Sequence, residues 1–247
     1  MMMSLKLISL NIEASNHLAT ILPWFQQEQP DVVCLQEVFK IDFPIIKAAL
    51  DMEGEFVAMV NVGQPNEYRL EPRGELGLAM LTKLSHLDFQ HEYYLKHGNQ
   101  VPELIDGQPN SGDRAIIWTT VTQAGQSFTI ASTHFTWSPA GQLIPLQETT
   151  YESMLKILTK IPELILCGDF NSPRSRGGIY DRLATQYQDH MPVHLDTTID
   201  GQLHRAGPLK FVVDGLFSSP EYLVNQVQVM GGLSDHMAIV AELSKKI

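Results

Sequence analysis

Short apolar runs alternate along the chain with polar segments rich in glycine and proline, a pattern that predicts many strands and few helices. Apolar residues at helical spacing predict three helices, over 16–28, 43–52 and 141–160. Glycine, proline and polar residues predict loops over 61–74 and 96–112. Strands are expected over 5–10, 32–35, 55–60, 75–82, 87–95, 114–122, 126–133, 163–167, 210–217, 223–230 and 237–243.

This order of elements predicts the fold class. The continuous apolar run 32–35 is typical of a strand that is covered on both faces. Many strands with few helices predict an α+β fold, an α/β sandwich of two packed mixed β-sheets flanked by helices. The chain has no internal repeat and no convincing linker, so we expect one domain over residues 1–247.

Composition narrows the picture further. Apolar residues make up 44% and charged residues 18%, which suits a packed core and excludes a disordered chain. A net charge of −11 argues against broad adhesion to polyanions but leaves local binding of nucleic acid open. Cys34 and Cys167 lie in apolar runs, where reduced core thiols are expected. We expect a cytoplasmic protein, because neither a transmembrane segment nor a secretion signal is evident.

Candidate chemistry begins at Gly168-Asp169-Phe170-Asn171, directly after the run 163–167. Side-chain alternation would place Asp169 and Asn171 on the same side of the strand end. A carboxylate can accept a proton and an amide can donate a hydrogen bond, the pair that holds and activates a water molecule. A Gly-Asp sequence after a strand is nevertheless most often a structural turn.

Similar polar groups recur at the ends of other predicted strands. Glu37 is a candidate metal ligand, since Mg²⁺ takes oxygen ligands, and His134 is a candidate proton donor or phosphate contact. Each residue also has an ordinary explanation as a solvent-facing charge or a structural histidine. Independent explanations of that kind multiply to a small probability for the whole set, which includes Asn11, Glu13, Asp214, Asp235 and His236.

These residues, in this order, resemble the endonuclease/exonuclease/phosphatase superfamily, whose members include DNase I, apurinic endonucleases, tyrosyl-DNA phosphodiesterases, sphingomyelinases and inositol polyphosphate 5-phosphatases. The resemblance spans residues 5–243 and implies a DNase I-like sandwich with the active site at one end. It also implies a Mg²⁺ cofactor, with Mn²⁺ as a second candidate. The metal ligands would be Glu37, chiefly, with Asn11, Glu13 and Asp235.

The resemblance implies roles for the remaining residues too. Asp169 would position or deprotonate the attacking water, and Asn171 would orient the water or the phosphate. His236 would stabilise charge on the phosphoryl oxygens, with Asp214 fixing its tautomer. His134 matches a second histidine found in the DNase I and sphingomyelinase branches.

Two further matches are shorter. Glu75 resembles the acid that orients the second histidine, and Arg114 resembles an arginine that contacts phosphate at a strand start. Glu75 could equally be a plain surface charge. Arg114 could be a solvated arginine that packs its aliphatic stem on the surface.

Substrate preference depends on basic loop residues. Arg174 and Arg176 follow Asn171, and Arg205 lies in the polar segment 189–209, so a positive rim for an anionic substrate is expected. The alternatives are a solvated turn and loop. A zinc site is also conceivable, although the spacings of the segment's three histidines match no familiar ligand pattern. These histidines are His190, His194 and His204.

We therefore expect a Mg²⁺-dependent phosphodiesterase that acts on nucleic acid, of the endonuclease/exonuclease type, as a monomer. The second hypothesis is a phosphatase or a sphingomyelinase-like hydrolase of a small or lipid phosphoester. The third is a binding module without turnover. The presence of Glu37, Asp169, Asn171 and His236 argues against it.

Overall fold

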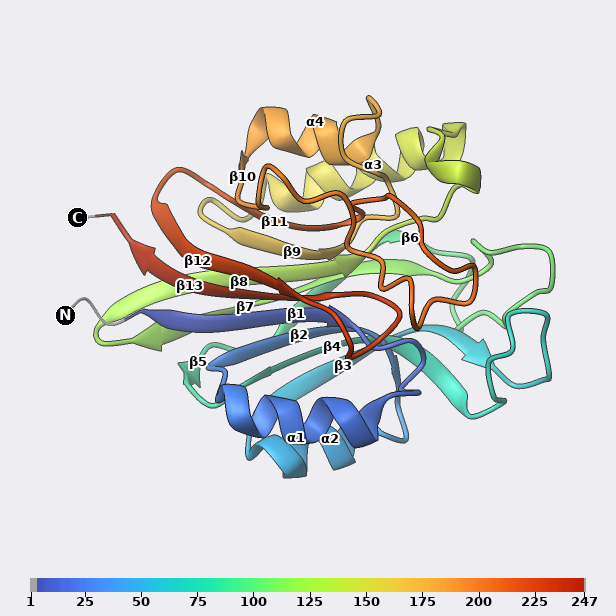
Figure 1. Ribbon diagram of the computed structural model, residues 1–247, viewed down its shortest axis with the longest axis horizontal. Helices are drawn as coiled ribbons and strands as arrows, with labels where there is room; N and C mark the ends of the chain where they lie inside the picture. Colours follow the sequence, from blue (N-terminus) through green and yellow to red (C-terminus); the bar gives the residue numbers. More distant parts are fainter. Residues whose placement is uncertain (1–3, 247) are drawn as a thin grey trace.

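Two stacked β-sheets form the centre of the computed structural model, which describes residues 4–246 (Figure 1). The first sheet has the order β12 (Tyr222–Met230), β13 (Ala238–Lys245), β1 (Leu5–Asn11), β2 (Val32–Phe39), β4 (Gly74–Thr82), β3 (Glu53–Val62). The second has the order β10 (Gln188–Asp189), β11 (Asp214–Ser218), β9 (Ile165–Asp169), β8 (Gln126–His134), β7 (Arg114–Gln123), β5 (Ser85–His86), with β6 (Gln90–Leu95) also paired to β7. The predicted pair of packed mixed sheets is confirmed.

Helices cover the outer faces of the sandwich (Figure 1). Those of the first sheet are α1 (Leu18–Glu28) and α2 (Phe43–Leu50), and those of the second are α3 (Pro145–Leu158) and α4 (Ile179–Gln186). A short 3₁₀ turn, Pro139–Gly141, precedes α3. The sequence did not predict α4, whose eight residues are mostly polar and include only three buried side chains, Ile179, Tyr180 and Leu183. Within residues 4–246, no helix is both long and apolar enough to traverse a lipid bilayer.

Strands of the sandwich are covered on one face by the other sheet and on the other by helices, which explains the continuous apolar runs. Along β1, Leu5 and Leu7 pack into the core between the sheets, whereas Ile8 and Leu10 pack in the cluster beneath α1 and α2. A strand of this kind has no solvent-facing side and therefore shows no polar alternation. The cysteines are both buried and unpaired, as expected of core thiols.

Strand register brings the polar strand ends together. The pairs β1–β2 and β8–β9 are parallel, and the other ladders are antiparallel. His134 on β8 is the register partner of Asp169 on β9, which in turn is the partner of Asp214 on β11. Three polar residues thus form one row across the second sheet. Asn11 at the end of β1 lies opposite this row and donates to Asp169.

One predicted strand begins later than expected. Residues 210–213 are irregular, and β11 starts only at Asp214. The amides of Val213 and Asp214 both donate to the Thr198 hydroxyl, and the Val213 carbonyl accepts from Phe170. These groups are satisfied by the neighbouring loops, so they do not join a ladder.

Candidate active site

Gly168 sets the distance between β8 and β9 at the site. Its φ of +135° and its close approach to β8 admit only glycine, because a Cβ would lie 2.0 Å from the Thr133 carbonyl oxygen. The two strands can therefore pack with Asp169 directly beside His134.

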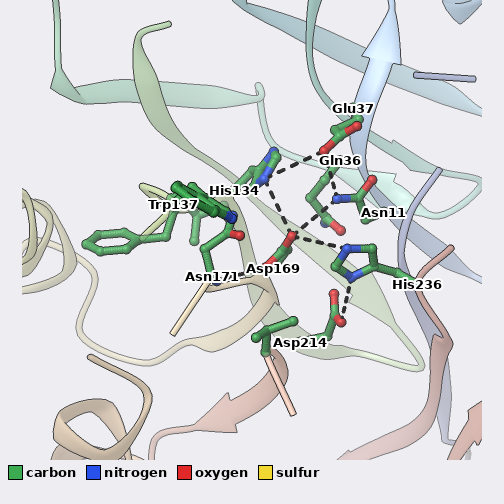
Figure 2. A network of polar contacts seen from close by, with 12 residues as sticks. Asn11, Gln36, Glu37, His134, Trp137, Asp169, Asn171, Asp214 and His236 are labelled. Atoms are coloured by element: carbon green, nitrogen blue, oxygen red, sulfur yellow. Dashed lines mark hydrogen bonds and ion pairs between the residues drawn. The ribbon is translucent and has the colours of Figure 1, made fainter. Parts of the chain in front are cut away.

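Asp169 is the centre of the polar network (Figure 2). Its Oδ1 accepts from the Asn171 amide at 2.8 Å, which makes the Gly-Asp turn an Asx turn. Its Oδ2 accepts from Asn11 Nδ2 at 3.2 Å and lies 3.5 Å from His134 Nε2 and 3.7 Å from His236 Nε2. Burial raises the pKa of Asp169 to about 7, although the positive charge of His236 opposes this shift. Two imidazoles and one amide thus converge on a single carboxylate oxygen.

His236 is held by Asp214. The distance from His236 Nδ1 to Asp214 Oδ2 is 2.9 Å, and both side chains are buried. This contact engages Nδ1, so Nε2 faces Asp169. Burial alone would lower the pKa of His236, but the negative charges of Asp214 and Asp169 outweigh it and raise that pKa well above its ordinary value.

His134 has different neighbours from those expected. Burial, with the positive charges of Arg114 and His236, lowers its pKa well below the ordinary value, so the ring is neutral at pH 7. Glu75, the acid expected to orient this ring, forms its side-chain hydrogen bond elsewhere. Glu75 instead accepts a hydrogen bond from Lys40 Nζ at 2.7 Å. Leu76 lines the cavity, and side-chain alternation along β4 therefore turns Glu75 to the other face.

The candidate metal ligands cluster beside this network. Glu37 has a left-handed φ of 57° at a β-bulge, where β2 shifts register against β4 between Leu35 and Val38. Its Oε1 accepts from Asn11 Nδ2 at 3.1 Å. Burial raises the pKa of Glu37, and the negative charges of Asp235 and Glu13 raise it further. Strained backbone therefore presents a carboxylate to other carboxylates, an arrangement that a cation would stabilise.

The donor set fits a hard divalent ion. Burial raises the pKa of Asp235 to about 6, and the charge of Glu13 adds to this shift. Carboxylate oxygens are the ligands that Mg²⁺ prefers. Glu13 also forms a hydrogen bond with His17, with 2.7 Å between Glu13 Oε2 and His17 Nε2. Asn11 turns its amide nitrogen toward the carboxylates while its oxygen accepts from the Glu13 amide, so in this arrangement it is a donor that orients them.

Asp169, Asp214 and His236 are a second group that could hold a metal, since one ligand atom of each lies within 4.8 Å of the others. Nδ1 of His236 is already engaged by Asp214, and its remaining nitrogen is a softer donor than Mg²⁺ favours. Glu37 and Asp235, in contrast, offer carboxylate oxygens, which are the ligands that Mg²⁺ prefers.

The four arginines expected to contact substrate occupy different environments. Arg114 is buried, lines the cavity, and has an Nε without a hydrogen-bond partner among residues 4–246. Burial lowers its pKa. Arg205 lines the cavity too, and Arg176 is exposed with its guanidinium carbon 4.8 Å from the Phe211 ring centroid.

Arg174, which was expected to contact substrate, binds backbone carbonyl oxygens of this chain. Its guanidinium donates to the carbonyl oxygens of Pro192 at 3.1 Å and Leu195 at 2.8 Å, and more weakly to Met191. These contacts make Arg174 a brace for the loop after β10.

Sequence reasoning missed two residues of this region. Gln36 is fully buried between the sheets and donates to Ser132 Oγ at 3.1 Å, next to Glu37. A glutamine inside an apolar strand was the available signal. Trp137 lies three residues beyond His134 with 42% of its surface exposed, and it lines the same cavity (Figure 2). An exposed aromatic residue after a functional strand end was its signal.

Comparison with known proteins places this arrangement in a family. The model of the Endonuclease/Exonuclease/phosphatase family matches residues 8–236. No curated protein matches the chain.

Several solved structures share the fold at low sequence identity. An endonuclease/exonuclease/phosphatase from Bacteroides vulgatus is 18% identical with a TM-score of 0.74, over 99% of this chain and 100% of that one. The human Nocturnin catalytic domain with bound sulfate is 18% identical with a TM-score of 0.71, over 98% and 94%. A mannosyl-6-phosphatase from Bacteroides thetaiotaomicron is 15% identical with a TM-score of 0.69, over 98% and 100%. The sandwich is thus DNase I-like, and the chain belongs to the Endonuclease/Exonuclease/phosphatase family.

Proposed function

We propose that the protein is a Mg²⁺-dependent phosphoester hydrolase. The observation that carries this proposal is the convergence of Asn11, His134 and His236 on Asp169, directly beside the carboxylates Glu37 and Asp235. Phosphoester hydrolysis needs an oriented water, donors for the phosphoryl oxygens and neutralised charge. The site contains groups suited to each requirement.

Each side chain has a task that follows from its contacts. Asp169 orients the attacking water and accepts its proton, while the backbone N–H of Asn171 donates to Asp169 and keeps that carboxylate in place. His236, held by Asp214, and the buried Arg114 donate to phosphoryl oxygens. In the reaction the water oxygen bonds to phosphorus, the ester P–O bond breaks, and the leaving alkoxide takes up a proton.

Glu37 and Asp235 would hold the Mg²⁺ ion, with Glu13 as a further carboxylate. When bound, the ion would neutralise phosphoryl charge and favour departure of the leaving oxygen. The retention of these groups together with Asp169 argues against a binding module without turnover.

The substrate class is less tightly constrained than the reaction. That the substrate is nucleic acid stays a prediction. Arg174 does not support it, because its guanidinium donates to backbone carbonyl oxygens. A cavity of about 840 Å³, bordered by loops, favours the second hypothesis, a small phosphoester.

The test is hydrolysis of bis(4-nitrophenyl) phosphate and 4-nitrophenyl phosphate by the purified protein, in Mg²⁺ and in EDTA. We expect Mg²⁺-dependent turnover that Asp169→Asn reduces by at least about 100-fold. The matched control is Asp189→Asn, which alters a carboxylate bound by Tyr180 and the Met191 amide outside the site. Equal rates for Asp169→Asn and the wild type would contradict the proposal.

A further inference from the structure

The catalytic cluster opens into a chamber with apolar walls. The cavity of about 840 Å³ that contains Asp169, His134 and His236 continues past them between four loops, 63–73, 96–113, 135–144 and 199–213. In Figure 1 these loops gather at one end of the sandwich. The chamber walls include three aromatic and three leucine side chains, Tyr68, Leu70, Leu104, Trp137, Leu209 and Phe211, and the polar residues Glu67, Ser138, His204 and Arg205 also line the cavity.

The four loops are bonded to one another. Asn110 donates to the Trp137 carbonyl at 2.9 Å and accepts from the Trp137 amide at 2.8 Å, which joins the second loop to the third. Asp106 accepts from the Glu67 amide at 2.9 Å, which joins the first loop to the second. Arg205 donates to the Tyr68 carbonyl at 3.3 Å, which joins the fourth loop to the first. Such cross-links preorganise the chamber before a ligand arrives.

Two loops are also anchored on the sandwich. Leu70 and Leu104 pack against the buried cluster that includes Val60 on β3 and Leu76 on β4. The side chain of Trp137, in contrast, stays 42% exposed although its backbone is bonded on both sides by Asn110. A large apolar side chain held at the mouth of a cavity is suited to contact a ligand.

The wall chemistry selects among ligands. A sugar or a nucleobase needs a polar partner for each of its hydroxyl or amide groups, whereas leucine and aromatic side chains make up much of the chamber wall. Of the two arginines among the lining residues, Arg114 has an Nε without a hydrogen-bond partner within residues 4–246, and Arg205 lies 5.9 Å from the Tyr68 ring. This combination suits a ligand with an anionic phosphoryl end and an apolar body.

We propose that the four-loop chamber binds the hydrophobic alcohol moiety of a small phosphoester and that Trp137 determines this preference. The inference rests on the proposed function, because the phosphoryl group would lie between His134 and His236. It excludes polymeric nucleic acid as the preferred ligand. Alkyl and aryl alcohols share the required chemistry and are separated by the experiment.

The test measures binding of phosphonates, which are not hydrolysed, to the full chain in Mg²⁺ by calorimetry. The probes are ethyl-, butyl-, hexyl- and naphthylphosphonate and a short single-stranded DNA. Affinity should rise along the alkyl series by up to about fourfold for each methylene group that enters the chamber. Trp137→Ala should weaken the hexyl or the naphthyl probe by about tenfold and the ethyl probe by no more than about twofold.

Two further variants keep the result interpretable. Trp137→Phe retains much of the apolar surface and should restore most of the lost affinity. Leu223→Ala removes a comparably exposed apolar side chain on β12, outside the cavity, and should change no affinity. Circular dichroism of each variant checks that the fold is intact.

Each outcome decides the proposal. A larger Trp137→Ala effect on the naphthyl probe assigns an aryl alcohol, and a larger effect on the hexyl probe assigns an alkyl alcohol. Affinities that do not depend on the apolar group, equal losses for every probe, or tighter binding of DNA than of any phosphonate would overturn it. Because these measurements require no turnover, a failure of hydrolysis would overturn the proposed function and leave the chamber's binding preference measurable.

Discussion

Replacing Asp214 by asparagine tests whether this carboxylate acts through His236. The substitution keeps the size of the side chain, and the amide oxygen can still accept from His236 Nδ1, but the negative charge is lost. Asp214 does not line the cavity, so substrate contacts are preserved. We therefore expect kcat to fall while KM stays close to its wild-type value.

The magnitude follows from the geometry. Unit charges 2.9 Å apart, the distance from His236 Nδ1 to Asp214 Oδ2, attract by about 6 kcal/mol at an effective dielectric constant of about 20. Desolvation of two buried groups offsets most of this, and a charge-assisted hydrogen bond contributes about 1.5–3 kcal/mol net. A loss of that size in the transition state corresponds to about a 10- to 150-fold fall in kcat.

The assay is steady-state hydrolysis of a chromogenic phosphodiester in saturating Mg²⁺, with Asp189→Asn as the matched control. The control removes the charge of Asp189, a partly buried aspartate on the second sheet that accepts from Tyr180 and from the Met191 amide. Equal kcat values for Asp214→Asn and the control would refute the role of Asp214. A rise in KM without a fall in kcat would refute the assignment of Asp214 to His236.

Three further predictions concern the stability of the fold. Gly168→Ala should destabilise the fold by about 3 kcal/mol or more in urea unfolding, because the added Cβ would lie 2.0 Å from the Thr133 carbonyl oxygen; an unchanged midpoint would contradict the tight β8–β9 packing. Arg174→Ala should lower the free energy of unfolding by about 1–3 kcal/mol with KM unchanged, since its guanidinium braces a loop; a raised KM with unchanged stability would restore the substrate role. Burial lowers the pKa of His190 to about 4, so the stability it contributes is complete above pH 6.5 and is lost as the pH falls toward 4. His190→Gln should reduce that loss of stability between pH 7 and pH 4 by about 1 kcal/mol, a value discounted because part of the ring is exposed to solvent. Thermal melts in which the wild type and the variant lose the same stability between the two pH values would refute the prediction.

The sandwich and the strand-end residues were predictable from the sequence for a common reason. Continuous apolar runs such as 32–35 report strands covered on both faces, and polar residues at their ends report where the chain leaves the core. Parallel pairing of β8 with β9 then places His134 beside Asp169. The local sequence indicates where each strand ends, and the register between strands determines which strand ends lie side by side.

The remaining contacts depend on the packing of distant segments. Glu75 and Arg174 have the residue types that the site would use, but Lys40 and the carbonyls of Pro192 and Leu195 bind them instead. These partners lie 18 or more residues away in the sequence, so no local pattern could predict the contacts.

The chamber and the bulge at Glu37 could not be predicted from the sequence, because both depend on contacts between distant segments. A left-handed glutamate inside a strand violates local preference and is maintained only by the surrounding sheet. The chamber arises from four loops that each have unremarkable composition. Only their cross-links, such as those of Asn110 with Trp137, show that they enclose one cavity.

The central claim is that Glu37 helps to hold a Mg²⁺ ion that phosphoester hydrolysis requires. The most direct measurement is the hydrolysis rate as a function of Mg²⁺ concentration for the wild type, for Glu37→Gln and for Glu163→Gln, a surface control whose carboxylate pairs with Lys245. We predict no turnover in EDTA, saturation by Mg²⁺ in the wild type and the control, and at least about a 10-fold higher Mg²⁺ requirement for Glu37→Gln. Full activity in EDTA, or the same Mg²⁺ dependence for all three proteins, would contradict the account.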